Sequence, residues 1–295
     1  MPNQAGTWVE IASGLREFVG RLDLVICDLW GVMHDGIRPH SRAIDAIVEA
    51  RAAGIKTVFL SNAPRPRGYV RDHLVAMGVP REITDLVVTS GGLARDEVRA
   101  LYSGAKLYHL GPEGDRNTIE GLPVDEVSHP DEADIIFATD LDFHEIDEHR
   151  LWLQKAAERG VPFLCANPDR IVHVGENLYP CAGAVADLYT GMGGDVHWFG
   201  KPTAKALTSC IGEVGMPADT DGRRIMMIGD SLQTDIAGAR AAGFCGLFIA
   251  GGIHREEAPL VAQSAKGDKI SVAEFQKIFG AEKAVPHAVM NALIW

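Results

Sequence analysis

Five polar residues lie next to apolar segments that are typical of buried strands. Asp28 ends the run LVICD, Ser61 follows TVFL, and Asp230 follows IMMIG, with Asp235 five residues further on. Lys201 precedes a segment expected to begin a helix near residue 203. Clustered carboxylates repel one another unless a cation joins them, and oxygen ligands suit Mg²⁺. The pattern therefore predicts a Mg²⁺ site where Asp28 attacks a phosphoryl group that Ser61 and Lys201 neutralise and orient.

Each of these residues also has an ordinary structural interpretation. An aspartate at a strand end often forms a turn or caps a helix, and Ser61 alone could be such a cap. Lys201 alone could be a solvated surface charge, and Asp235 could favour the positive start of its helix. The hypothesis of a functional site rests on four segments that occur in order, each at the matching end of its element.

Short, almost wholly apolar runs alternate with helical patterns along the chain. Strands that are buried on both faces of a parallel sheet have this composition. The expected strands cover 24–28, 57–60, 85–89, 225–228 and 246–250, and the expected helices cover 41–54, 92–102 and 234–243. The alternation predicts an α/β fold with a Rossmann-like, doubly wound parallel sheet. Ligands of such sheets bind beyond the carboxyl ends of the strands.

The middle of the chain restarts the alternation with strands of its own. The runs KLYHL, DIIFA and PFLC lie within 104–195, separated by acidic, turn-rich segments. This predicts an inserted α/β cap domain at 104–195. The core domain is then expected to comprise residues 1–103 and 196–295, so that both termini belong to the core.

Composition narrows the class of protein. The 295 residues carry 28 Lys and Arg against 40 Asp and Glu, a net charge of −12, which opposes binding to nucleic acid or to an acidic membrane surface. No apolar run approaches the roughly 18 residues of a membrane span, and the amino terminus lacks the pattern of a signal peptide. The five cysteines are scattered, as expected for buried thiols in a reducing compartment. We therefore expect a globular cytoplasmic protein.

The ordered segments DLWGV (28–32), FLSN (59–62), GKP (200–202) and GDSLQTD (229–235) resemble the four motifs of the haloacid dehalogenase superfamily. The long insertion between the second and third motifs is similar to that of the class IIA branch, the NagD-like and 4-nitrophenylphosphatase-like enzymes. The resemblance implies Mg²⁺-dependent hydrolysis of small phosphorylated metabolites through an aspartyl phosphate.

The resemblance also implies a role for individual residues. Asp28 would carry the phosphoryl group. Mg²⁺ would be bound by the carboxylates of Asp28 and Asp230 and by the backbone carbonyl of Trp30. Asp235 would contact a water on the metal or the ammonium group of Lys201. The residues implied in phosphate binding are Gly31, Ser61, Asn62 and Lys201.

The side chain of Trp30 departs from the family pattern. Phosphatases of the family carry an aspartate at this position, which protonates the leaving oxygen and then activates water. Indole can do neither, because its N–H is a donor that does not titrate usefully. His34 or Asp35, on the same loop, could replace the missing acid. Two hypotheses stay open: an attenuated or specialised phosphatase, and a catalytically weak or inactive binder of phosphorylated ligands.

Three residues of the expected cap are candidates for substrate contacts. Asn167 and Asp169 belong to the turn NPD, and Asp140 follows the run DIIFA. They are expected near the domain interface, with the alternative that they fix the cap's own turns. The sequence does not name the substrate, and a homo-oligomer is possible.

Overall fold

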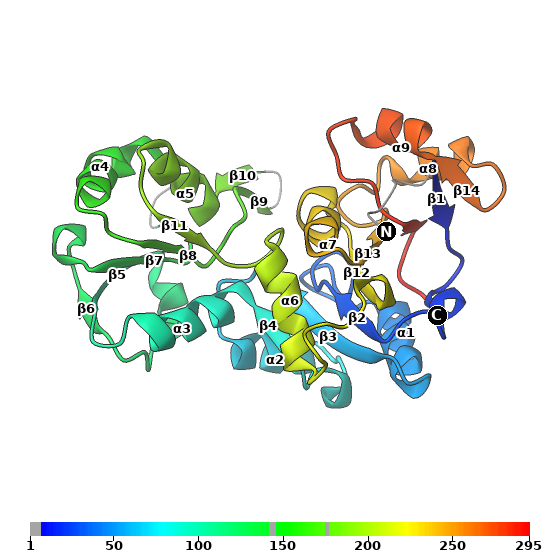
Figure 1. The fold of residues 1–295 in the computed structure, drawn as a ribbon, viewed down its shortest axis with the longest axis horizontal. Coiled ribbons are helices and arrows are strands. Elements are labelled where there is room, and N and C mark those ends of the chain that lie inside the picture. Colours follow the sequence, from blue (N-terminus) through cyan, green and yellow to red (C-terminus); the bar gives the residue numbers. More distant parts are fainter. Residues whose placement is uncertain (1–6, 142–145, 175–176) are drawn as a thin grey trace. The chain divides into compact units, whose positions relative to one another are not determined.

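The computed structural model describes residues 7–141, 146–174 and 177–295 (Figure 1). The chain forms two compact units. The first contains the chain up to Ser61, then Arg71–Val87, and everything from Lys201 onward. The second contains Asn62–Val70 and Val88–Gly200. The backbone thus passes between the units at four peptide bonds, two of which adjoin the predicted site residues Ser61 and Lys201.

The first unit is built on a mixed sheet of eight strands among the described residues, in the order β14-β1-β15-β13-β12-β2-β3-β4. All five predicted core strands are present. Their bounds are β2 Leu24–Cys27, β3 Lys56–Ser61, β4 Val87–Thr89, β12 Ile225–Gly229 and β13 Cys245–Ile249. Three strands on one side of the sheet were not predicted: β1 Trp8–Ile11, β14 Lys269–Ser271 and β15 Ala288–Met290. The antiparallel pair β1 and β14 is what makes the otherwise parallel sheet mixed.

The centre of this sheet is formed by β2 and β12, which pair in parallel with Cys27 opposite Ile228. Every side chain of both strands is buried, as their apolar sequences LVIC and IMMIG require. The chain continues from β2 to β3 on one side and from β12 to β13 on the other. The carboxyl ends of β2 and β12 therefore lie at the point where the winding reverses, which is the usual ligand position in such sheets.

Helices connect the strands of the first unit. Their bounds are α1 Ser41–Ala52, α6 Ala204–Glu213, α7 Ala237–Ala242, α8 Ala258–Ser264 and α9 Val272–Phe279, with α2 at Arg67–Ala76, where the chain crosses between the units. The sequence patterns predicted α1, α6 and α7, whereas α2, α8 and α9 were not predicted. The hydroxyl of Thr203 accepts a hydrogen bond from the Ala206 amide and so caps α6 directly after Lys201. A π-helical turn at Leu232–Ile236 precedes α7 and carries Asp235.

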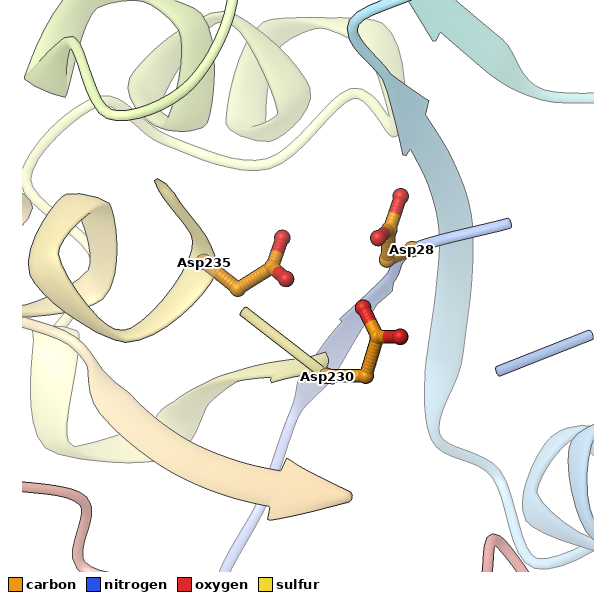
Figure 2. A group of neighbouring side chains, drawn as sticks. All are labelled: Asp28, Asp230 and Asp235. Carbon is orange, nitrogen blue, oxygen red and sulfur yellow. The ribbon is translucent and has the colours of Figure 1, made fainter. Parts of the chain in front are cut away.

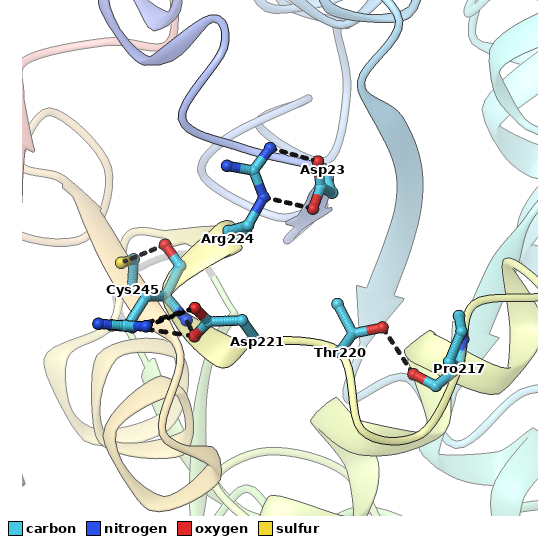
Figure 3. A network of polar contacts seen from close by, with 7 residues as sticks. Asp23, Pro217, Thr220, Asp221, Arg224 and Cys245 are labelled. Atoms are coloured by element: carbon cyan, nitrogen blue, oxygen red, sulfur yellow. Dashed lines mark hydrogen bonds and ion pairs between the residues drawn. The ribbon is translucent and has the colours of Figure 1, made fainter. Parts of the chain in front are cut away.

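The amino-terminal edge of β2 and β12 is closed by polar contacts (Figure 3). Arg224, directly before β12, donates from Nε and Nη2 to the carboxylate of Asp23, directly before β2, at 2.5 and 2.6 Å. In the preceding loop, the Thr220 hydroxyl donates to the Pro217 carbonyl at 2.6 Å. The Arg224–Asp23 contact joins the residues that directly precede β12 and β2. It helps to fix the register of the two strands, and thereby the positions of the aspartates that follow their opposite ends.

The second unit has a five-stranded sheet of its own, in the order β11-β8-β7-β5-β6, and all its pairs are parallel. Its strands are β5 Lys106–Leu110, β6 Asp125–Val127, β7 Ile135–Ala138, β8 Phe163–Cys165 and β11 Val196–Trp198. The hairpin β9 Ile171–Val174 and β10 Asn177–Pro180, and the helices α3 Ser90–Leu101, α4 Arg150–Glu158 and α5 Ala182–Gly191, complete it.

The bounds of the units differ from the expected domain boundary at residue 104. Helix α3 was expected in the core domain, whereas it lies in the second unit. The reason is its apolar face: Ala94 and Val98 pack in one buried cluster with Leu107, Phe137 and Leu164, which belong to the strands of the second sheet. Among the described helices, none combines the length and the hydropathy that a membrane crossing requires.

Candidate functional site

Three buried aspartates of the first unit come together at the centre of its sheet. Asp28 follows β2, Asp230 follows β12, and Asp235 lies in the π-helical turn after β12. Each offers an oxygen atom, and these atoms lie within 4.8 Å of one another. Figure 2 shows the carboxylates pointing toward a common centre. Residues separated by about two hundred positions in the sequence thus form one cluster.

Lys201 supplies a positive charge to this cluster. Its Nζ lies 2.6 Å from Oδ1 of Asp28 and 2.7 Å from Oδ1 of Asp235, and the side chain is 3% exposed. Burial alone would lower the pKa of Lys201, but the charges of Asp235 and Asp28 outweigh it and raise the pKa above its usual value. The lysine is therefore an ammonium ion at any physiological pH, ready to attract an anionic group.

One ammonium group does not balance three carboxylates. Burial, followed by the charges of Asp28 and Asp235, raises the pKa of Asp230 to about 8. Burial and the charge of Asp28 raise the pKa of Asp235 to about 7, against the opposing effect of Lys201. Without a further cation the site therefore disfavours the ionised forms of Asp230 and Asp235, and a bound cation would stabilise them.

Backbone amides orient all three carboxylates. The Leu29 amide donates to Oδ1 of Asp28 at 2.8 Å. The amide of Ser231 donates to Oδ2 of Asp235 at 3.0 Å, and that of Ile253 donates to Oδ2 of Asp230 at 2.9 Å. These bonds fix the side chains before any ligand binds, because each amide belongs to a loop anchored at a strand end.

Two glycines allow the backbone to approach Asp230. A Cβ atom on Gly31, whose φ is +77°, would lie 1.8 Å from Oδ2 of Asp230, and one on Gly252 would lie 2.2 Å from the same atom. Gly252 and Ile253 were not predicted as part of the site. Their signal in the sequence is the pair of glycines at 251 and 252, directly after a core strand.

The residues fit a bound Mg²⁺ ion. The donors are oxygen atoms, three carboxylates of the described residues are close enough to share one ion, and a divalent cation would stabilise their ionised forms. Asp28 and Asp230, the predicted carboxylate ligands, are both members of the cluster, and Asp235 contacts Lys201. The predicted metal role of the Trp30 carbonyl stays a prediction.

Changing Asp230 to asparagine tests the metal site. Asparagine keeps the acceptor for the Ile253 amide but removes one charge. We expect Mg²⁺ affinity, measured by calorimetry, to fall by roughly tenfold or more. At a pH above 8, where Asp230 is ionised without Mg²⁺, thermal unfolding of the metal-free variant should shift to higher temperature, because one repelling charge is gone. Asp45→Asn, an exposed position on α1, is the control for losing a charge. Unchanged affinity in the Asp230 variant would refute the site.

The two candidates for a replacement acid are poorly suited to donate a proton. His34 is buried, its Nδ1 accepts the Gly36 amide at 3.0 Å, and burial lowers its pKa to about 4. Asp35 is exposed, and hydrogen bonds from the Arg38 and Ile37 amides lower the pKa of its carboxyl. Near neutral pH the environments of both side chains therefore favour the deprotonated forms.

The remaining predicted residues divide between the units. Ser61 ends β3 in the first unit, whereas Asn62 belongs to the second, where its amide donates to Oδ1 of Asp169 at 3.0 Å. Asn167 accepts the Asp169 amide at 3.3 Å, which is the turn-forming role considered for it.

The three cap candidates lie around one buried thiol in the second unit. Burial and then the charges of Asp140 and Asp169 raise the pKa of Cys181 to about 12, against the opposing effect of a hydrogen bond with Asn167. The structure thus brings Asp140, Asn167 and Asp169 together within their own unit, beside a thiol that stays protonated and unreactive.

Comparison with known proteins places these residues in context. The sequence pattern of haloacid dehalogenase-like hydrolases matches residues 25–124, and a second pattern of such hydrolases matches residues 198–273. The two matches include Asp28, Ser61, Lys201, Asp230 and Asp235. A hydrolase of the haloacid dehalogenase-like family from Brucella suis is 32% identical, with a TM-score of 0.76 over 96% of this chain and 100% of that one.

Two further relatives have named activities. A D-glycerol 3-phosphate phosphatase of Mycobacterium tuberculosis is 27% identical over 237 residues, which is 79% of this chain and 64% of the relative, so the chain spans less than two thirds of that protein. The crystal structure of a glycerol phosphate phosphatase from the same species, in complex with magnesium, is 25% identical. Its TM-score is 0.63 over 80% of this chain and 70% of that one.

Proposed function

The chain belongs to the haloacid dehalogenase-like hydrolases, and from this membership we propose that it is a Mg²⁺-dependent phosphatase of small phosphorylated metabolites. The observation that carries the proposal is the buried ammonium group of Lys201, between a candidate nucleophile, Asp28, and a third carboxylate, Asp235. A relative that acts on D-glycerol 3-phosphate supports the substrate class, and the magnesium complex of a related phosphatase supports the metal.

In the proposed reaction, Asp28 attacks phosphorus, and the bond from phosphorus to the ester oxygen breaks. The leaving group departs with the electron pair, and the phosphoryl group is left on the Asp28 carboxylate. Lys201 attracts the phosphate oxygens, and the Ser61 hydroxyl provides a hydrogen-bond donor. Bound Mg²⁺ would neutralise the charges of the phosphate and of the carboxylates. Water then cleaves the aspartyl phosphate and releases inorganic phosphate.

Trp30 makes this phosphatase specialised. No carboxylate stands at position 30 to protonate the leaving oxygen, and the environments of His34 and Asp35 do not supply an acid. Esters of acidic alcohols should react, because their leaving groups depart without a proton, whereas alkyl phosphates should react slowly. Dephosphorylation should also be slow, because no carboxylate activates the attacking water.

Turnover of 4-nitrophenyl phosphate tests the proposal. We expect release of 4-nitrophenolate that depends on Mg²⁺, stops on chelation and returns when Mg²⁺ is restored. Inorganic phosphate should inhibit competitively. Saturable, Mg²⁺-dependent phosphate binding without turnover would instead identify a binder of phosphorylated ligands. If the protein shows no turnover and no phosphate binding, both functions are rejected.

The cellular setting is part of the proposal. A net charge of −12 favours a small anionic substrate held at a buried lysine over nucleic acid or membrane partners. A cytoplasmic location and a possible homo-oligomer complete the proposal and stay predictions.

A further inference from the structure

The indole of Trp30 is exposed although the residue lies only two positions after the buried Asp28. Its side chain is 59% exposed, an unusual state for a large aromatic group. Trp30 is two residues after Asp28, and the next residue, Gly31, lies against the carboxylate of Asp230. Trp30 therefore belongs to the same loop as the nucleophile and directly precedes the glycine that lies against the carboxylate cluster.

The exposed ring is braced by its own loop. The imidazole of His34 meets it edge to face, with ring centroids 5.6 Å apart and an interplanar angle of 76°. Gly36 lies so close that a Cβ atom there would be 2.4 Å from Cη2 of the indole. The Gly31 amide donates to the His34 carbonyl at 2.8 Å and closes the loop. The ring is thus positioned without being buried, which is the state of a preformed contact surface.

A second exposed apolar side chain flanks the same carboxylate. Ile253 is 60% exposed, and its amide donates to Asp230. Asp230 is therefore contacted by Gly31, next to Trp30 on the loop after β2, and by Ile253 on the loop after β13. Beside a phosphate site, such apolar groups suit the organic part of an ester and do not suit its charged part.

We infer that Trp30 is a specificity-determining residue whose indole stacks on a planar, conjugated leaving group, so that the preferred substrates are phosphomonoesters of aryl or heteroaryl alcohols. This inference rests on the proposed function. The two roles of the residue agree chemically. Tryptophan stands where a general acid is expected, and it favours esters that need no general acid, because an aryloxide departs without a proton. Aromatic stacking beyond simple burial corresponds to roughly a 3- to 10-fold preference.

The test compares two substrates whose leaving alcohols have similar acidity: phenyl phosphate, which is planar, and hexafluoroisopropyl phosphate, which is not. We expect Trp30→Leu to raise KM for phenyl phosphate roughly 3- to 10-fold and to leave KM for the second ester nearly unchanged. Trp30→Phe should restore most of the loss. Equal changes for both esters would overturn the inference, because they would show a structural role without selectivity.

Gly36→Ala tests the bracing of the ring independently. The added methyl group must displace the indole, so KM for phenyl phosphate should rise as in Trp30→Leu. Gly20→Ala is the matched control: Gly20 also has a positive φ, +79° against +93° for Gly36, but nothing lies within 4 Å of its Cβ position. An effect of equal size in both alanine variants would contradict positioning by Gly36.

A binding experiment separates this inference from the proposed function. Phenylphosphonate and cyclohexylphosphonate are similar in size and cannot be hydrolysed, and calorimetry in the presence of Mg²⁺ gives their affinities. In the unaltered protein, we expect phenylphosphonate to bind roughly 3- to 10-fold more tightly than cyclohexylphosphonate. In Trp30→Leu, the two phosphonates should bind with equal affinity. This result would support stacking even if the protein hydrolyses nothing. Equal affinities in the unaltered protein would reject stacking even if it is an active phosphatase.

Discussion

Replacing Asp28 with asparagine should lower the turnover of 4-nitrophenyl phosphate by on the order of 10⁴-fold or more, as expected for loss of a nucleophile. The amide is nearly the same shape and keeps an oxygen for the Leu29 amide, so the fold should persist. What disappears is the negative charge that attacks phosphorus and that pairs with Lys201 at 2.6 Å. Steady-state rates with Mg²⁺ measure the loss, and acid-quenched mass spectrometry should find a phosphoryl adduct on the unaltered protein alone.

Asp221→Asn is the control for this experiment. It makes the same chemical change at the opposite edge of the sheet, in the network of Figure 3, and should leave the rate within about twofold. An Asp28 variant that keeps more than a tenth of the activity would show that another group attacks the phosphate, and an adduct located elsewhere in the sequence would identify that group.

The second large effect is expected from Trp30→Asp, which introduces the acid found at this position in the phosphatases that the chain resembles. Turnover of alkyl phosphates should rise by roughly 10²-fold, because a carboxylic acid can now protonate the leaving oxygen. Dephosphorylation should also accelerate, so less phosphoenzyme should accumulate on Asp28. Because the indole is exposed, its loss should cost little stability.

The measurement is the dependence of the rate on the pKa of the leaving alcohol, from nitrophenyl to simple alkyl esters. The slope should be steep in the unaltered protein and shallow in Trp30→Asp. Trp30→Asn introduces a side chain similar in size to aspartate that cannot titrate, and this variant should keep the steep slope. Rapid alkyl hydrolysis by the unaltered protein, unaffected by His34→Ala or Asp35→Asn, would mean that an unrecognised group is the acid.

The centre of the fold and of the candidate site could be predicted from the sequence because both depend on local patterns. Buried parallel strands are apolar throughout, so β2 and β12 were recognisable, and parallel strands bring their carboxyl ends to one edge. Asp28 and Asp230 follow these strands directly. Their proximity follows from the pairing of Cys27 with Ile228.

Other features depend on contacts that a local pattern does not encode. The apolar face of α3 suits either sheet equally well, and only the packing of Ala94 and Val98 in the second unit decides between them. The strands β1 and β14 are short, Glu10 interrupts the apolar residues of β1, and β14 has a single apolar residue, so neither shows an apolar run. Gly252 and Ile253 reach Asp230 because β13 is the neighbour of β12, a fact of sheet order rather than of sequence.

The four peptide bonds at which the chain passes between the units have a mechanical consequence. Ser61 is the last residue of the first unit before one crossing, and Lys201 is the first residue after another. Any rotation of one unit against the other must be absorbed by backbone torsions at these crossings, because covalent connections do not slide. Two of the four crossings therefore lie directly beside the residues whose side chains are proposed to bind phosphate. Torsional changes at these two crossings would therefore occur in the backbone next to the proposed hydroxyl and ammonium donors.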